Sequence, residues 1–306
     1  MSSCADTQRE RAEALARTAA GATATGDWRA AIDRADVDIV VVATTNDALA
    51  DVARFALGAG KHVLVEKPAA RSVVEIDAVI DEAARCRRLV RVGFNHRYHP
   101  GLLKARELLD AGVLGDLMFV RGRYGHGGRV GYEQEWRADP AVAGGGELID
   151  QGVHLIDLSR WFLGDFVTVD GFAHTYFWRM PVDDNAFMTL RTSRAQTAFL
   201  HASCTEWKNL FSFEIYGRDA KVDVEGLGGS YGLERTACYT MRPEMGPPDT
   251  AIWEYPRADQ SWALEFEAFL EDIRLDRPPA AGLGDARAAL VVVAEIQRQS
   301  GDPKTR

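Results

Sequence analysis

The segment DIVVVATTNDALADVARFALGAGKHVLVEKP, residues 38–68, decides the fold. It opens with a short continuous run of apolar, mostly β-branched residues, which is typical of a strand buried on both faces of a parallel sheet. The polar cluster at 44–47 can cap the helix expected over residues 48–57, and two glycines then end that helix. A second strand is expected at 62–65. The segment therefore predicts a strand, a helix and a parallel strand in succession.

The same alternation continues toward the C-terminus. A helix is expected over residues 72–86 and a third strand over 89–93. Alternating strands and helices indicate a doubly wound α/β sheet. We therefore expect a Rossmann-like dinucleotide-binding domain over residues 1–114.

The pattern changes after a helix expected around 102–109. Longer strands that read as antiparallel follow, and they are expected at 115–124, 168–178, 187–192, 196–203, 211–216 and 221–224. Two helices close the chain, one with an apolar face formed by Trp262, Phe266, Phe269, Leu270 and Ile273, the other capped by Asp285. We predict an α+β substrate-binding domain over residues 115–306, with a large, mainly antiparallel sheet and closing helices that pack back on the first domain. The polar tail 301–306 is expected to fray.

The composition limits the class of partner. Of the 306 residues, 46% are hydrophobic and 26% charged, which is the balance of a soluble globular protein. The net charge of -9 argues against nucleic acid as a partner. The four cysteines lack CxxC spacing, which argues against a zinc site and against a secreted disulfide framework. With no apolar stretch of about 20 residues and no signal sequence, we expect a cytoplasmic protein that binds a small molecule and no membrane.

A lysine follows the second predicted strand. Glu66-Lys67-Pro68 occupies the carboxyl end of that strand, which is where open α/β sheets bind ligands. An ammonium group there can hydrogen-bond a substrate hydroxyl and favour its deprotonation. A solvated lysine beside a proline that ends the strand is the competing interpretation, and the tripeptide alone leaves both open.

A glycine-rich loop runs into an apparent helix over residues 144–157, GGGELIDQGVHLID. Asp150 and His154 are four residues apart, which places a carboxylate and an imidazole on one helical face, shared with Glu147 and Asp157. An ordinary core histidine, or a surface partner of Asp157, is the alternative. Two features favour a functional site, because glycines permit close backbone approach and polar side chains on an apolar segment cost stability unless they are used.

Four motifs occur along the chain: EKP at 66–68, GFNHRY at 93–98, Trp136-Arg137, and GGG-x-x-x-D-x-G-x-H from 144 to 154. Together they resemble the Gfo/Idh/MocA family, which includes glucose-fructose oxidoreductase, inositol dehydrogenase and rhizopine-catabolism proteins. The resemblance covers nearly the whole chain. It implies an NAD(P)-dependent dehydrogenase or reductase that transfers a hydride between NAD or NADP and a hydroxyl or keto group of a polyol, sugar, nucleotide sugar or similar cyclic substrate. It also suggests a homodimer or homotetramer.

The resemblance further implies a catalytic trio of Lys67, Asp150 and His154. His154 would be the acid/base, Lys67 would polarise the reacting oxygen, and Asp150 would orient the other two. Histidine suits that role because its unperturbed pKa is about 6.5. The residues expected to face the cofactor are Asp6, Thr45, Asn46, Glu66, Lys67, Asn95, Trp136 and Arg137. The residues expected to contact substrate are Lys67, Asp150, His154, Tyr124 and His126, although the last two also fit as ordinary loop residues.

The first βα unit of a dinucleotide-binding domain, with its G-x-G-x-x-G turn, is not found in the sequence. Asp6 resembles the acidic residue that ends the second strand of such a domain, and the glycines at 226–232 lie among antiparallel strands. We therefore expect two exposed strand edges, loose packing of residues 1 to about 35, and poor dinucleotide binding. Asp6 favours NAD because a carboxylate repels a 2′-phosphate, while Arg9 and Arg11 keep NADP open.

Two other function classes remain open. One is a non-catalytic small-molecule binding or partner protein that has lost the nucleotide site. The other is a metal-dependent sugar isomerase or lyase with Glu147, Asp150, His154 and Asp157 as ligands. The metal-dependent class is disfavoured because four such side chains on one helix cannot all converge on one ion, so no metal site is predicted. The exact substrate and the direction of hydride transfer are not specified by the sequence.

Overall fold

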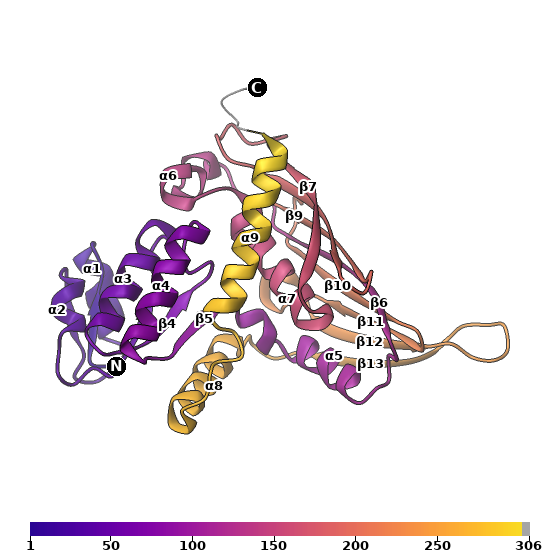
Figure 1. Cartoon of the computed structure of the whole chain (residues 1–306), viewed down its shortest axis with the longest axis horizontal. Helices are drawn as coiled ribbons and strands as arrows, with labels where there is room; N and C mark the ends of the chain where they lie inside the picture. The colour runs from indigo at the N-terminus through magenta and orange to yellow at the C-terminus, as the bar shows by residue number, and fades with distance from the viewer. Residues whose placement is uncertain (302–306) are drawn as a thin grey trace.

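The computed structural model describes residues 1–301, and most of the tail expected to fray, 302–306, lies outside the described residues. Strands and helices alternate through the first part of the chain, as expected (Figure 1). They are β1 (Ser3–Ala5), α1 (Arg9–Ala16), β2 (Thr23–Thr25), α2 (Trp28–Ile32), β3 (Ile39–Val42), α3 (Asn46–Gly58), β4 (His62–Glu66), α4 (Val73–Cys86) and β5 (Val90–Gly93). This confirms the Rossmann-like alternation of the first domain.

The parallel strands form two separate sheets. One sheet joins β1 to β2, and the other has the order β3-β4-β5. Val41 of β3 is 56% exposed, and only Cys4, Ala12 and Ile32 are buried among the apolar side chains of residues 1–35. Trp28 packs edge-on against Phe55 of α3, at 5.2 Å between ring centroids, and ties this region to the second sheet.

An eight-stranded sheet forms the core of the second part. Its order is β13-β12-β11-β10-β6-β9-β8-β7, and every neighbouring pair is antiparallel except β6 and β9. The strands are β6 (Leu117–Gly125), β7 (Phe166–His174), β8 (Asn185–Thr192), β9 (Thr197–Ser203), β10 (Leu210–Gly217), β11 (Ala220–Glu225), β12 (Glu234–Thr240) and β13 (Asp249–Tyr255). The mainly antiparallel sheet is confirmed, but the sequence analysis did not anticipate β12 and β13.

Alternation along β10 and β11 separates a buried face of the sheet from an open one. In β10, Phe211, Phe213 and Ile215 point inward while the residues between them are partly exposed. The α-helices of the second part are α5 (Pro100–Asp110), α6 (Pro140–Ala143), α7 (Val153–Leu163), α8 (Ser261–Leu275) and α9 (Leu283–Ser300). Of these, α5, α7 and α9 pack against the large sheet. Short turns of other helix types are η1 (Asn95–Tyr98), η2 (Tyr132–Gln134), η3 (Trp136–Ala138), η4 (Leu148–Gly152) and η5 (Gly229–Tyr231).

Helix α9 links the two parts of the molecule. It contacts β7 and α7 on one side and α4 and β5 on the other, and Figure 1 shows it standing between the parallel strands and the large sheet. Its first turn is closed by Asp285, whose carboxylate accepts a hydrogen bond from the backbone N–H of Gly282. The N-cap is therefore Gly282. Asp285, which was expected to be the N-cap, lies in the first turn of the helix and accepts the hydrogen bond from there.

The apolar face expected for α8 is only partly buried, since Phe269 is its one fully buried member. Trp262, Phe266 and Leu270 are between 37% and 57% exposed, whereas the helix buries Glu265 and Asp272 as well as Phe269 and Ser261. The reason lies in β5, where the fully buried Arg91 forms an ion pair with Asp272. A buried guanidinium needs a carboxylate partner, so the polar side of α8 faces the first domain.

Candidate active site

A cavity of about 700 Å³ lies where the carboxyl ends of the parallel strands meet the second domain. Glu66 and Lys67 reach it from the end of β4, and Asn95, His96 and His99 from the segment after β5. The large sheet and its helices contribute Tyr124, His126, Asp150, Gln151 and His154. Further residues come from the loop after β11 and from α8. The predicted catalytic trio is therefore gathered around one cavity.

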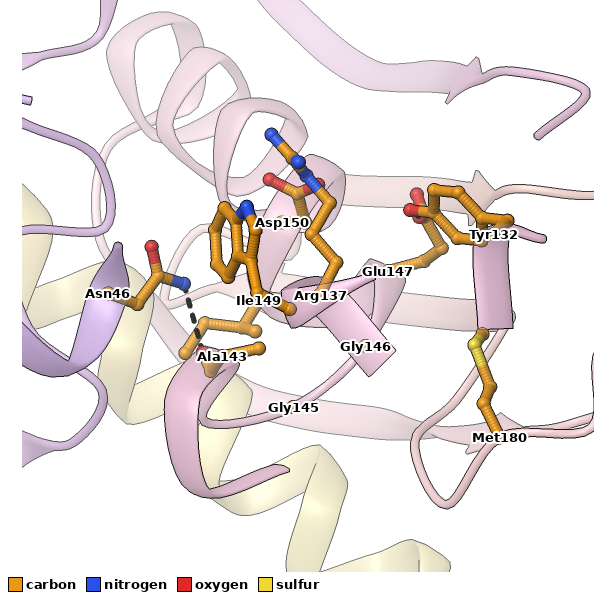
Figure 2. A pocket seen from close by; sticks show the side chains of 11 residues that line it. Asn46, Tyr132, Arg137, Ala143, Gly145, Gly146, Glu147, Ile149, Asp150 and Met180 are labelled. Atoms are coloured by element: carbon orange, nitrogen blue, oxygen red, sulfur yellow. Dashed lines mark hydrogen bonds and ion pairs between the residues drawn. The ribbon is translucent and has the colours of Figure 1, made fainter. Parts of the chain in front are cut away.

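Lys67 and Asp150 are joined directly. The Lys67 ammonium forms an ion pair with the Asp150 carboxylate and also donates to the Asp150 backbone oxygen at 2.7 Å. Arg137 donates from Nε to the other carboxylate oxygen at 3.2 Å, and Figure 2 shows the two side chains next to each other. Burial alone would raise the pKa of Asp150, but the Lys67 and Arg137 charges outweigh it and lower that pKa. Asp150 is thus an anion that fixes two cations.

Asp150 does not lie on a regular α-helix, as the sequence analysis assumed. Residues Leu148–Gly152 form a π turn, and the α-helix begins at Val153. Such wide turns occur frequently at functional sites, because they rotate one side chain relative to the helix that follows. Asp150 and His154 still line the same cavity.

The glycine triplet approaches other parts of the chain closely. A side chain at Gly146 would place its Cβ 1.8 Å from the backbone oxygen of Asp183, and one at Gly144 would meet Arg71 at 2.7 Å. The Asp183 carboxylate accepts from the backbone N–H groups of Gly146 and Leu148 at 3.0 and 2.8 Å. Burial raises the pKa of Asp183 to about 6 despite those bonds. Asp183 thus holds the turn in place, a role that the sequence analysis missed.

His154 is buried and has the properties of a proton acceptor. Its side chain lies at the edge of Phe94 and stacks on His96, with 3.9 Å between the two imidazole centroids. Burial and then the charge of Lys67 hold the pKa of His154 well below its usual value. The imidazole is therefore neutral at pH 7, and its Nδ1 has no hydrogen-bond partner among the described residues.

Tyr124 and His126 both line the cavity, in different ways. Tyr124 is buried, with its ring 5.9 Å from that of His154. His126 lies 3.4 Å from Glu147, which also accepts from the Tyr132 hydroxyl at 3.0 Å. Burial lowers the pKa of His126, but Glu147 outweighs burial and raises it. Glu147 lines the small pocket of Figure 2, which Asp150 also lines, and not the large cavity that holds His154.

Asp157 is also separated from the cavity. Its carboxylate pairs with the buried Arg97, with 2.8 Å between Nε and Oδ2. Within residues 1–301 no cluster of three or more His, Cys, Asp or Glu side chains is arranged to hold a metal ion. The four residues considered as metal ligands therefore face different partners. In the same range, no helix has the length and apolarity required to cross a membrane.

The residues expected to face a nicotinamide cofactor lie in three places: the large cavity, the small pocket beside it, and outside both. Glu66, Lys67, Asn95 and Arg137 line the large cavity. Asn46, Trp136 and Arg137 line the small adjoining pocket, where Asn46 donates to the Ala143 backbone oxygen at 2.9 Å (Figure 2). Outside both cavities, the Thr45 hydroxyl donates to Asp47 at 2.6 Å, and the Asp6 carboxylate accepts from the backbone N–H of Gln8 at 2.7 Å.

The nicotinamide end of such a cofactor fits the residues that are present. Glu66 is held beside Gly93, and Asn95 donates to Ser261 at 2.8 Å, so both are positioned at the cavity wall. Behind them the buried Glu265 has one carboxylate oxygen without a partner among the described residues. The pyrophosphate end is different, since no strand-to-helix connection of the first domain in residues 1–301 carries the G-x-G-x-x-G motif.

Residues 227–231 of the glycine loop at 226–232 line the large cavity. Tyr231 lies 5.5 Å from the Tyr124 ring, and Asn209 donates to the Ser230 hydroxyl at 2.7 Å. The sequence predicts no phosphate-binding turn in this loop, because its glycines lie among antiparallel strands. The run of glycines was the sequence feature that could have identified this loop as part of the site, since Gly228, Gly229 and Gly232 all have positive φ. Sequence reasoning also missed His99, Asp259 and Trp262, which complete the wall.

Comparison with known proteins gives two family matches. The profile described as "Oxidoreductase family, NAD-binding Rossmann fold" matches residues 2–94, and the one described as "GFO/IDH/MocA C-terminal domain" matches residues 102–223. Inositol 2-dehydrogenase 2 of Saccharopolyspora erythraea is 31% identical over 272 residues, which cover 87% of this chain and 75% of that protein.

Levoglucosan dehydrogenases are similar in sequence and in fold. The enzyme of Pseudarthrobacter phenanthrenivorans is 33% identical over 201 residues, which cover 62% of this chain and about half (49%) of that protein. A solved structure of levoglucosan dehydrogenase in complex with NADH and levoglucosan superposes with a TM-score of 0.87 at 22% identity, covering 98% of this chain and 89% of that one. At that identity the superposition shows a shared fold.

Proposed function

This chain belongs to the Gfo/Idh/MocA family of NAD(P)-dependent oxidoreductases, and we propose from that premise that it transfers a hydride between NAD(P) and a hydroxyl or keto carbon of a polyol, sugar, nucleotide sugar or similar cyclic substrate. The observation that carries the proposal is the meeting of Lys67, Asp150 and His154 at one cavity. These three side chains supply what alcohol oxidation needs, which is a cation for the oxygen and a base for its proton.

The roles of the trio follow from their contacts. Asp150 holds the Lys67 ammonium in place through two of its N–H groups, and the third N–H is available to the substrate oxygen. The neutral imidazole of His154 takes the hydroxyl proton, because the low pKa of His154 keeps it unprotonated at pH 7. When bound, the nicotinamide supplies the hydride acceptor or donor. Lys67 stabilises the negative charge that develops on the oxygen as its proton leaves.

The remaining cofactor contacts are part of the proposal. Glu66 and Asn95 face the nicotinamide end, and Arg137 and Trp136 border it from the second domain. Thr45 and Asn46 begin α3 and lie toward the middle of the dinucleotide. Asp6 ends β1, where a carboxylate accepts from a free ribose 2′-hydroxyl, so NAD is favoured over NADP.

The lining of the cavity supports a substrate with many hydroxyl groups. Beside the trio, the cavity lining carries donors and acceptors from Asn209, Ser230, Tyr231 and Asp259, with the Trp262 ring among them. Polar side chains interleaved with aromatic rings suit sugars and cyclic polyols, whose ring faces are apolar and whose edges carry hydroxyls. Tyr124 and His126 complete this substrate side.

The open face of the large sheet supports a homodimer or homotetramer. Phe172 and Phe199 are 47% and 54% exposed on that face, and Phe187 stacks on His201 beside them at 4.2 Å. An apolar sheet face of this kind is a suitable surface for a second copy of the chain. The division into a cofactor domain at 1–114 and a substrate and oligomerisation domain at 115–306 belongs to the same proposal.

One observation favours a second candidate function. None of the strand-to-helix connections of the first domain in residues 1–301 offers the three-glycine turn that binds a pyrophosphate. A non-catalytic protein that binds a sugar-like ligand in the cavity accommodates that observation. The two candidates differ in whether this chain oxidises the ligand that it binds.

The deciding experiment uses the chain with NAD⁺ or NADP⁺ and a panel of inositols, sugars and nucleotide sugars, following nicotinamide absorbance. We expect reduction of NAD⁺ with at least one substrate, and loss of that rate in Lys67→Ala. Gly26→Ala is the matched control, since a methyl group at that exposed turn meets nothing within 4 Å. Ligand binding by calorimetry with no turnover in the wild-type chain would instead support the binding protein.

A further inference from the structure

Three histidine side chains lie side by side along the cavity, with His96 between the other two. His96 stacks on His154, with 3.9 Å between ring centroids and 29° between ring planes, and its other neighbour His99 is 5.5 Å away. All three line the cavity and are between 2% and 4% exposed. His96 and His99 come from the turn after β5, whereas His154 comes from α7. We call this set, His154, His96 and His99, the histidine array.

Two ring nitrogens of the histidine array have no partner among the described residues. They are Nδ1 of His154 and Nε2 of His96, while Nδ1 of His96 lies 3.2 Å from the Asn95 side-chain oxygen. Buried polar atoms are usually satisfied, and the exceptions gather at sites where protons or ligands are exchanged. The unsatisfied atoms here are on the two rings that stack, which points to exchange between them.

The outer end of the histidine array is anchored by two carboxylates. Nδ1 of His99 is 3.1 Å from Glu234, which also accepts from the backbone N–H of Gly101 at 2.6 Å. Nε2 of His99 is 3.9 Å from Asp259, whose side chain is 25% exposed. Glu234 therefore fixes the orientation of the His99 ring, and the second nitrogen of that ring faces a carboxylate that water can reach.

The charges around the histidine array permit few protons on it. The groups that face it are Lys67 at the end of β4, Tyr124 on β6, Asp150 on η4, and Glu234 and Asp259 at the outer end. Burial, and then the charge of His154, hold the pKa of His96 well below its usual value. A proton on either stacked ring therefore disfavours a second proton on the other.

We propose that His96 and His99 form a proton path that carries the proton taken up by His154 to Asp259 and the solvent. The proposal rests on the proposed function. In the oxidative direction the substrate O–H bond breaks and its proton goes to His154, while the C–H bond leaves with both electrons as hydride to the nicotinamide oxidant. The proton then passes to His96, to His99 and to the Asp259 carboxylate, and reduction of a ketone reverses each transfer.

Stacked rings do not hydrogen-bond face to face, so the transfer between His154 and His96 needs an intermediary. Nδ1 of His154 and Nε2 of His96 are themselves closed to water, so a bridging water molecule from the polar cavity of about 700 Å³ meets them only after one of the rings turns. His96 and His99 are positioning and relay residues in this scheme. They do not contact the reacting carbon.

The first test needs no turnover. The ring nitrogens of the histidines are titrated by NMR in the full chain, for the wild type, His154→Phe and His96→Phe. His174→Phe on β7 is the control, because this histidine lies outside the cavity. We expect the His96 titration to move to higher pH in His154→Phe, since the neighbouring ring no longer competes for the proton. Titrations of His96 and His154 that are each unaffected by replacement of the other ring would overturn the proton path.

The second test follows turnover. We expect His96→Phe to lower kcat about tenfold with KM within about twofold, and added imidazole to restore kcat in His96→Ala. The melting temperature of each variant is measured, and His96→Asn replaces any variant that does not fold. A kcat and pH profile equal to the wild type in His96→Phe, or a loss in His96→Ala that imidazole does not restore, contradicts the path. If the wild type oxidises nothing, the proposed function fails while the NMR titration still decides whether the rings share a proton.

Discussion

The cavity wall and the N-terminal pair of strands lie in the same molecule but differ in how tightly they are held. Asp150 is tied to Lys67 and Arg137, and the turn that carries it is held by Asp183. In contrast, β1 and β2 form a sheet of their own with few buried side chains. The difference indicates that the substrate side is preorganised, whereas the region expected to meet the adenosine end of a cofactor depends on few tertiary contacts.

The largest effect is expected from removing the lysine of the trio. Lys67→Ala leaves the buried Asp150 with Arg137 as its remaining cation and deprives the substrate oxygen of its hydrogen-bond donor. We expect kcat/KM to fall by about 10²–10⁴, as is common when an acid/base or electrostatic group is lost. Steady-state kinetics measure this. A comparably large loss in Asp6→Ala, at the end of β1, would show that the two regions matter equally for catalysis.

The next largest effect is expected when the same methyl group is added in each region and the stability of the two variants is compared. Gly146→Ala puts a Cβ 1.8 Å from a backbone oxygen, whereas Gly26→Ala between β2 and α2 meets nothing within 4 Å. We expect the first variant to lose at least ~3 kcal/mol of unfolding free energy and the second to change it by at most ~0.5 kcal/mol. Urea denaturation measures both. Equal stability of the two variants would contradict the rigid turn around Asp150.

A smaller effect should appear at the buried face of α8, as a dependence on pH. Burial, with the nearby charge of Glu66, raises the pKa of Glu265 to about 8 from an ordinary value of 4.5. Because the folded-state pKa is the higher one, stability is fully present below pH 4.5 and is lost as pH rises toward 8. We expect Glu265→Gln to gain ~1–3 kcal/mol over the wild type at pH 8 and little at pH 5.

Thermal unfolding at the two pH values measures this difference. Asp259→Asn, just before the start of the same helix, is a control, since Asp259 is partly exposed. A stability gain in Glu265→Gln that is the same at pH 5 and pH 8 would mean that Glu265 is not held protonated by burial.

The smallest effect concerns the contact between the N-terminal region and α3. Trp28→Ala removes the edge-on packing against Phe55, at a side chain that is only partly buried. We expect a loss of about 1 kcal/mol in global stability. We also expect hydrogen exchange to become faster in β1 and β2 and to stay unchanged in β6 and β10. Exchange that also increases in the large sheet would show that the two regions unfold as one unit.

Much of the fold and part of the site could be predicted from local patterns. The apolar runs at 38–43 and 62–65 correctly indicated parallel strands, although only β4 is well buried and β3 leaves Val41 exposed. The position of Lys67 at a strand end placed it at a ligand-binding edge. The four motifs together, of which one ends at His154, identified the family. These inferences depended on short spacings along the chain.

What the sequence did not reveal depends on contacts between distant residues. Glu234 orients His99 across 135 positions, and Asp183 holds a turn 37 residues before it. The π turn at 148–152 has an ordinary helical sequence, so its extra residue per turn could not be anticipated. The apolar side chains of α8 also gave a wrong indication of the buried face of that helix, because the buried Arg91 pairs with Asp272 and determines which face turns inward.

The central claim is that Lys67, Asp150 and His154 act on a carbon that gives up a hydride. The most direct measurement is mass spectrometry of the cofactor after incubation of NAD⁺ with the best polyol or sugar of the panel, deuterated at the reacting carbon. The account predicts that one deuterium appears in the reduced nicotinamide with the wild-type chain, and that Lys67→Ala and His154→Ala transfer it at least about a hundredfold more slowly. Reduced cofactor without deuterium, or equal transfer by the two variants, would contradict it.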